Sequence, residues 1–241
     1  MRNNSHFFIH INVLKKLSKK QKLLLEPVIL TLIGIISILL WDTFLIYPIK
    51  IFAVLIHEIS HGIIALFTGG HVNSIQIYWN LGGQCDSSDG SKLLIALAGY
   101  SGSIIVGASF FLSAYSKKYS KYFNTAFAVL LILIVSNWIS GTAGITFSVL
   151  FAAFLFVSPR YFPNIVHFYL MKIIGLVSVL YSVADIKEDL LTKTFVQTDA
   201  SLLQNITGIS STFWGLLWFF ISIGTVIFLL YYSYKKGLQK Y

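Results

Sequence analysis

Residues 49–70 read IKIFAVLIHEISHGIIALFTGG. The run is apolar and long enough to cross a lipid bilayer as a helix, and the Gly69-Gly70 pair is typical of a helix end. It carries His57, Glu58 and His61 near its middle. Ionisable side chains at that depth are costly in lipid and usually functional. The stretch therefore predicts a membrane helix, over residues 49–67, that carries a reactive centre.

The whole chain has the same apolar character. Of its 241 residues 56% are hydrophobic and only 11% are charged, and its mean hydropathy is +0.76. A soluble domain has about 25% charged residues, so this chain could not cover a water-facing surface. Lipid is the solvent for most of it, and the predicted fold class is an all-α polytopic membrane protein.

Apolar runs between glycine, proline or lysine clusters predict about seven transmembrane helices. They cover residues 27–47, 49–67, 92–115, 124–139, 145–157, 165–191 and 211–232. Residues 71–90 differ, because apolar and polar side chains alternate there before Gly82-Gly83. This pattern predicts a short β-hairpin after the second helix, at the membrane surface or inside a protein cavity, since unpaired strand edges are not tolerated in lipid.

The net charge of +9 comes mainly from lysine clusters that flank the apolar runs, at residues 15–22, 117–121 and 235–240. Flanking lysines are typical of membrane anchoring and topology. We therefore expect contact with the lipid bilayer and no binding of nucleic acid. With seven spans the first cluster and the other two fall on opposite sides of the membrane, so the positive-inside rule gives no orientation.

The spacing of the ionisable residues in the second run indicates a metal site. His57 and His61 are four residues apart, so on a helix they lie on one face, about one turn apart. Two imidazoles at this spacing can bind one tetrahedral Zn²⁺ ion. Glu58 sits beside the first histidine, where it can accept a proton from a zinc-bound water.

Two other functions use the same residues. A membrane metal-binding or transport protein could employ the histidines and aspartates as an ion pathway, and a protease-like scaffold could keep the residues without activity. Glu58 discriminates between hydrolysis and ion transit, because proton abstraction needs Glu at this position whereas ion transit would tolerate Gln or Asp.

The sequence around the histidines resembles a known family. His57-Glu58-Ile59-Ser60-His61-Gly62, followed by Thr68-Gly69-Gly70, is similar to the M50 metallopeptidases of the site-2-protease class, and more narrowly to the M50B-like branch. Two later segments, residues 98–102 (AGYSG) and the acidic residues 185–190 with Thr198-Asp199-Ala200, resemble further family segments. The resemblance covers residues 50–205.

The resemblance implies an intramembrane zinc metalloprotease with Glu58 as the catalytic residue. Its substrates would be transmembrane or membrane-associated proteins, cleaved as in regulated intramembrane proteolysis. We accordingly divide the chain into a basic interfacial segment (1–26), a membrane-embedded metalloprotease domain (27–233) and a basic tail (234–241). The low-charge composition, rich in Lys and Ile, suggests a bacterial plasma membrane.

A catalytic zinc usually has three protein ligands and a water, and the resemblance implies that the third ligand is an Asp from a later helix. The Leu-Asp-Gly form of that motif is absent. We expect Asp185, near the end of the sixth apolar run, to be the ligand, with Asp189 and Asp199 as alternatives. In the strand at residues 72–79, we expect Ile75, Ile77 and Trp79 to present an extended substrate by β-augmentation.

Overall fold

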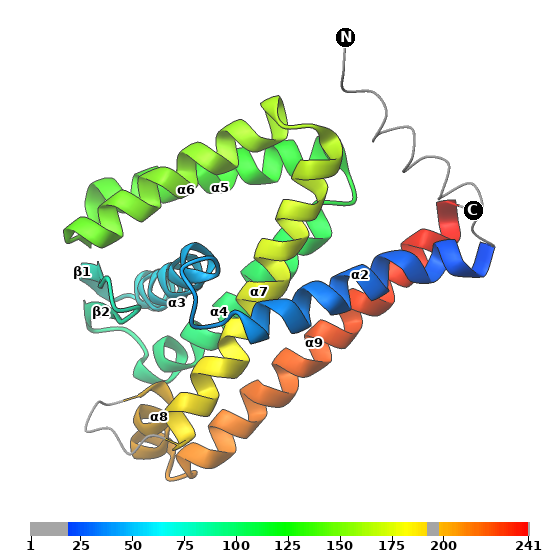
Figure 1. The fold of residues 1–241 in the computed structure, drawn as a ribbon. Helices are drawn as coiled ribbons and strands as arrows, with labels where there is room; N and C mark the ends of the chain where they lie inside the picture. Colours follow the sequence, from blue (N-terminus) through cyan, green and yellow to red (C-terminus); the bar gives the residue numbers. More distant parts are fainter. Residues whose placement is uncertain (1–18, 192–197, 241) are drawn as a thin grey trace.

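The computed structural model describes residues 19–191 and 198–240, with the side chains of 19–23, 185, 187–191 and 237–240 left outside this description. The described residues form eight helices and three short strands (Figure 1). The helices are α2 (Lys19–Leu39), α3 (Tyr47–Phe67), α4 (Lys92–Ser113), α5 (Lys117–Asn137), α6 (Thr142–Tyr161), α7 (Asn164–Leu191), α8 (Asp199–Thr207) and α9 (Ser211–Lys240). The strands are β1 (His71–Ile77), β2 (Gly83–Ser88) and β3 (Ile139–Ser140).

The predicted class, a polytopic helical membrane protein, is confirmed, with six candidate spans among the described residues instead of about seven. These are Tyr47–Phe67, Lys92–Ser113, Lys117–Asn137, Thr142–Tyr161, Asn164–Ala184 and Ser211–Lys236. The predicted first span, 27–47, ends early, since α2 stops at Leu39 and turns follow. Its apolar part, Leu24–Leu39, is about 24 Å long, which is short of a hydrocarbon core of about 30 Å.

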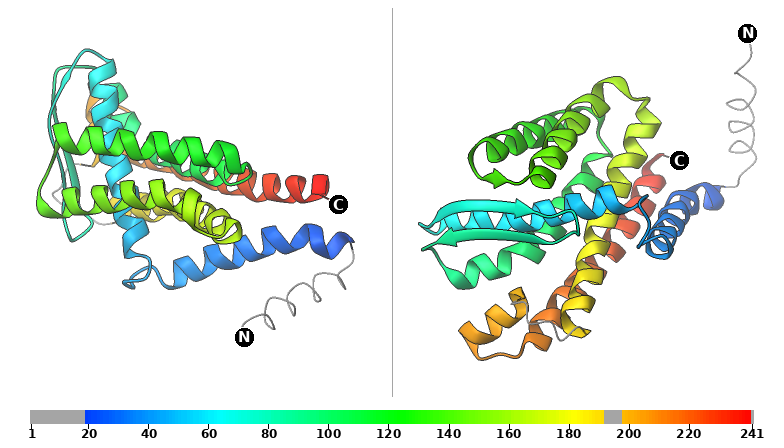
Figure 2. Two further views of the ribbon diagram at one scale, coloured as in Figure 1. Left: turned by 90° about the horizontal axis from the view of Figure 1, so that it is seen from above. Right: turned by 60° about the vertical axis from the view of Figure 1, so that its left-hand side comes forward.

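Helix α3 is the most buried of the six candidate spans, and it crosses the direction of α2, α5, α6 and α9 (Figure 2, left). Its apolar residues from Ile51 to Ile56 are all buried. The ring of Phe52 contacts those of Phe110, Phe127 and Phe151, which come from α4, α5 and α6. Helix α3 is therefore shielded by protein on several sides, and the ionisable residues that it carries face protein groups instead of lipid.

The predicted hairpin is confirmed, and it packs along α3. The strand order is β2-β1-β3, with β1 antiparallel to β2 and parallel to β3. A register shift between Val72 and Ser74 changes the phase of β1, so that Val72 and Ile75 are both buried, and a Cβ on Gly62 of α3 would lie 3.3 Å from each of them. The Tyr47 hydroxyl donates a hydrogen bond to the Trp79 carbonyl (2.7 Å), which ties the hairpin turn to the start of α3.

Helix α8 lies within residues 192–210, a segment too polar to be predicted as a membrane span. Its N-terminus is a capping box, in which Thr198 and Ser201 each bond the other's backbone N–H. It ends at Gly208, whose φ of 74° is favourable for glycine. The buried residues of α8 form a cluster with α4, α7 and α9, made of Ala96, Tyr100, Ile186, Ala200, Leu203 and Trp218. These contacts hold α8 against the bundle.

The two predicted terminal segments are only partly described. Residues 1–18 lie outside the description, and α2 begins at Lys19. Helix α9 continues through the predicted tail as far as Lys240. The division of the chain at residues 26 and 234 stays a prediction.

A buried ion pair joins α2 to the bundle far from the histidines. The Lys172 ammonium of α7 is fully buried and pairs with Glu26 of α2. It lies over the rings of Tyr115 and Phe168, 3.7 and 4.1 Å from their centroids. Tyr115 also donates to Glu26 and contacts Ser233 of α9. Such pairs are costly to break, because removing one partner leaves an uncompensated buried charge.

We expect Lys172→Met to lower the free energy of unfolding by about 3–5 kcal/mol, because Glu26 loses its ammonium partner. The measurement is thermal unfolding in detergent. The double variant Glu26→Gln/Lys172→Met is the control and should recover most of the loss. Equal destabilisation by the single and double variants would show that the ion pair does not hold α2 in place.

Candidate metal centre

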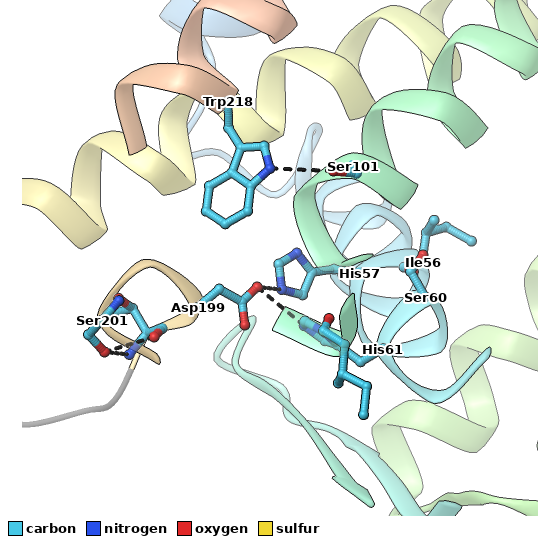
Figure 3. A network of polar contacts seen from close by, with 10 residues as sticks. Ile56, His57, Ser60, His61, Ser101, Asp199, Ser201 and Trp218 are labelled. Atoms are coloured by element: carbon cyan, nitrogen blue, oxygen red, sulfur yellow. Dashed lines mark hydrogen bonds and ion pairs between the residues drawn. The ribbon is translucent and has the colours of Figure 1, made fainter. Parts of the chain in front are cut away.

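Three ligand atoms from two helices converge beside α3 (Figure 3). The Asp199 Oδ2 atom, at the first position of α8, lies 3.1 Å from His57 Nε2 and 3.3 Å from His61 Nε2. All three atoms lie within 4.8 Å of one another. Two ligands that are each about 2.0–2.1 Å from a tetrahedral zinc lie about 3.3 Å apart, so the observed spacings to Asp199 fit one shared metal ion.

The hydrogen bonding of His61 shows that this cluster needs a cation. His61 Nδ1 lies 2.7 Å from the Ile95 carbonyl oxygen. A carbonyl only accepts, so Nδ1 carries the hydrogen, and Nε2 of the neutral ring presents a lone pair to Asp199. Asp199 Oδ2 is buried and has no hydrogen-bond donor within the described part of the chain. Two facing lone pairs repel, and a metal ion or a proton between them removes the repulsion.

The charge state of Asp199 suits a metal ligand. Burial alone would raise the pKa of its carboxyl group, but the positive charge of a protonated His61 and hydrogen bonds from both histidines in that form outweigh burial and hold this pKa well below its usual value. In the metal-free centre the carboxylate is therefore ionised beside protonated histidines, and a metal ion would take the place of those protons.

Aromatic and glycine residues of α4 fix the histidines. The Tyr100 ring packs edge-on against His57, with centroids 4.8 Å apart, and it contacts the Trp218 ring of α9 at the same distance. A Cβ on Gly99 would collide with His57 and would lie 2.6 Å from His61 Nε2. Only a glycine at 99 leaves room for both imidazoles.

Helix α9 supports this packing from the far side of Tyr100. The indole N–H of Trp218 donates to the Ser101 hydroxyl of α4 (3.4 Å), as Figure 3 shows. Trp218 is almost fully buried, with 1% of its surface exposed. The orientation of the Tyr100 ring, and through it that of His57, therefore depends on the contact between α4 and α9.

Glu58 and the histidines line a cavity of about 630 Å³. Glu58 is buried, with 8% of its surface exposed, and a Cβ on Gly83 would lie 2.5 Å from its carboxylate oxygen Oε1. The β2 backbone therefore approaches the Glu58 carboxylate closely. Cys85 also lines the cavity. Burial, together with the charges of Glu58 and Asp86, raises the pKa of its thiol to about 12, so the thiol is protonated at neutral pH in the metal-free centre.

The strand edge beside the cavity belongs to β2. Ile75 of β1 donates its N–H to the Trp138 carbonyl (2.8 Å), on the side of β3. Ile75 is paired with Cys85, and because its N–H is used on the β3 side, this is a non-hydrogen-bonded pair between β1 and β2. In such a pair of an antiparallel ladder, both residues direct their N–H and C=O groups away from the partner strand. Cys85, and by the same alternation Gly83, thus direct N–H and C=O away from β1, toward an edge on which no described strand lies.

The residues predicted to present substrate lie elsewhere in the sheet. Ile75 and Ile77 are buried in the core, and β1 is paired with β2 on one side and with β3 at residues 75 and 76 on the other. Trp79 lies beyond β1, and its indole N–H donates to Thr142 (3.4 Å). An alternating pattern identifies a strand but not its place in a sheet, and β3 supplies a partner for which the sequence carries no signal.

The predicted ligands and base divide into two groups. The structure brings together the side chains of His57, Glu58, His61 and Asp199 around one cavity. Residues 185 and 189 belong to the last turns of α7, and the side chains of these two aspartates lie outside the described part of the chain. Among the described side chains, that of Asp199 lies at the histidines, and the roles expected of Asp185 and Asp189 stay predictions.

Some contributions to the site carry weak signals in the sequence. No pattern in the sequence marks Gly83 and Cys85 of β2 as cavity-lining residues. A clearer signal lies at α8, where the capping sequence Thr198-Asp199-Ala200-Ser201 precedes the helix-ending Gly208. This pattern could have placed Asp199 at the start of a short helix.

Comparison with known families finds a match over most of the chain. The family model described as Peptidase M50B-like matches residues 29–229, which include α3, the hairpin, α8 and most of α9. Comparison with curated proteins and with solved structures gives no significant match. The matched range covers most of the 241 residues, and the chain therefore belongs to the M50B-like peptidase family.

Proposed function

We propose that the protein is an intramembrane zinc metalloprotease in which His57, His61 and Asp199 hold the metal. Asp199, an alternative in the sequence analysis, takes the role expected of Asp185. The observation that carries the proposal is the convergence of two imidazole nitrogens and a buried carboxylate oxygen on a cavity that Glu58 also lines. Nitrogen and oxygen ligands with one open position are typical of catalytic zinc.

Glu58 is the general base in this proposal. Bound zinc would supply a Lewis acid that polarises the peptide carbonyl and lowers the pKa of water. Glu58 accepts the proton of the attacking water and then donates it to the leaving amine. Its burial beside Gly83 keeps the carboxylate in one place for both transfers. His61 is oriented by the Ile95 carbonyl, and His57 by the Tyr100 ring.

The outward edge of β2 is the proposed substrate-binding strand. A peptide bond within a helix is protected by its own hydrogen bonds, so a helical substrate must first unwind. The outward N–H and C=O groups of Gly83 and Cys85 could hold the unwound segment by β-augmentation, next to Glu58. The proposed substrates are transmembrane or membrane-associated proteins, cleaved as in regulated intramembrane proteolysis. The proposed location of the protein is a bacterial plasma membrane.

Metal content separates the candidate ligands. We expect about one zinc per chain in the wild-type protein, loss of zinc in Asp199→Ala, and retention in Asp185→Ala. Glu58→Gln should keep the metal and lose activity by about 10²–10⁴-fold, because only proton transfer is removed. The measurements are elemental analysis of the purified protein and cleavage of a model transmembrane peptide. Zinc retained in Asp199→Ala but lost in Asp185→Ala would favour Asp185 as the third ligand.

Gly99 tests how closely α4 must approach the metal ligands. Gly99→Ala should abolish zinc binding, because its Cβ would occupy space that both imidazoles need. Gly224→Ala is the matched control, since a Cβ there meets nothing within 4 Å. Both variants should be folded by thermal unfolding, with zinc lost only from the first. Full zinc content in Gly99→Ala would contradict the close approach.

The β2 edge is tested at Cys85. Cys85→Pro removes the outward N–H but no hydrogen bond to β1, and proline is tolerated on strand edges. We expect it to lose peptide cleavage while keeping zinc. Cys85→Ala is the control, because it removes the thiol and keeps the N–H, and it should remain active. Equal activity of the two variants would exclude the edge as the substrate strand.

A further inference from the structure

Positively charged residues gather at one end of the molecule. Tyr115, in the turn between α4 and α5, contacts Glu26 of α2, Phe168 of α7 and Tyr232 of α9. These contacts bring the start of α2, the α4–α5 turn, the start of α7 and the end of α9 together, as Figures 1 and 2 show. We name this the lysine end.

The turn between α6 and α7 belongs to the same end. Ser120, in the first turn of α5, bonds His167, in the first turn of α7 (2.8 Å). Arg160, at the end of α6, donates to Thr125 of α5 (2.9 Å). The α6–α7 turn therefore lies beside the start of α5.

Apart from the buried Lys172, which pairs with Glu26, the described basic residues of the lysine end are Lys117, Lys118, Lys121, Arg160, Lys235 and Lys236. The three lysines of α5 and Lys235 are exposed. Exposed tyrosines accompany them, at positions 119, 122, 161 and 231. Lysines mixed with tyrosines are typical of the interface between lipid and water.

The opposite end carries the metal centre and has the opposite charge. Its connecting segments, residues 68–91, 138–141 and 198–210, contain no Lys or Arg but hold Asp86, Asp89 and Asp199. Lys92 begins α4 there. We name this the site end.

The path of the chain agrees with this division. Helix α4 ends at the lysine end, α5 begins there, α6 ends there, α7 begins there and α9 ends there. The Glu26 contact places the start of α2 at the lysine end as well. Helix α3 stays beside the hairpin at both ends, because Tyr47 at its start bonds Trp79 and Phe67 at its end leads into β1. The conflict that seven spans created for the positive-inside rule therefore disappears.

We infer that the lysine end lies against the anionic headgroups of the cytoplasmic leaflet, and that the hairpin, α8 and the metal-centre cavity open toward the opposite side. Each lysine near an anionic surface favours membrane contact, and lysine and arginine bias sets the orientation of short connecting segments. The inference rests on charge and chain path, and does not depend on the proposed proteolytic activity.

Cysteine accessibility tests the orientation. The only native cysteine, Cys85, is first replaced in Cys85→Ser. Single cysteines are then introduced as His71→Cys or Asn205→Cys at the site end, and as Lys118→Cys or Lys235→Cys at the lysine end, all at exposed positions. A membrane-impermeant maleimide applied to intact cells should label only the site-end pair, and permeabilisation should add the lysine-end pair. The reverse pattern, or labelling of all four in intact cells, would overturn the inference.

Lipid composition tests the partner. The purified protein is placed in nanodiscs of phosphatidylcholine, with or without phosphatidylglycerol, and its thermal unfolding is measured. The wild-type Tm should be higher with the anionic lipid, and the Lys117→Gln/Lys118→Gln/Lys121→Gln variant should lose most of that difference. An equal Tm of the wild type in both lipids would exclude the anionic headgroups as the partner.

Discussion

The close approach of a buried carboxylate to two imidazole nitrogens is the constraint on which the rest of the structure depends. Asp199 Oδ2 lies 3.1 and 3.3 Å from the histidine Nε2 atoms, and the Ile95 carbonyl fixes the hydrogen of His61 on the far nitrogen. A polar group buried without a partner is costly in an apolar bundle. The fold must therefore accommodate a cation, and it must hold three side chains from two helices in place to do so.

Two pieces of irregular structure make this arrangement possible. The hairpin covers one side of α3 through Val72 and Ile75, and it brings the β2 backbone to Glu58. Helix α8 carries Asp199 to the histidines, and its buried Ala200 and Leu203 dock against α4 and α9. Neither element is long enough to cross a membrane as a helix. Each is tolerated because it lies against protein and borders a cavity, which is where non-helical backbone can exist in a membrane protein.

The sequence predicts the helical class, the hairpin and three of the four residues at the centre, because each has a local signal. His57, Glu58 and His61 share one helix, so their spacing determines their geometry. Asp199 reaches them across more than 130 residues of chain, and no periodicity encodes that distance. Asp185 stands out in the sequence because it ends an apolar run, whereas Asp199 lies in a polar segment whose short helix has only its capping residues as a signal. The place of β1 in the sheet is equally hidden, since β3 pairs with it from a distant segment.

Glycine at the contact surfaces shows why the site requires such close packing. At Gly99 a side chain would enter the space of both imidazoles, and at Gly83 it would displace the Glu58 carboxylate. The first position holds α4 near the two histidines and the second holds β2 near Glu58. A peptide on the β2 edge would therefore lie within reach of Glu58 without any movement of α3. The distance between substrate and base is set by backbone approach, which a single methyl group would increase, and this links the packing of an apolar bundle directly to its chemistry.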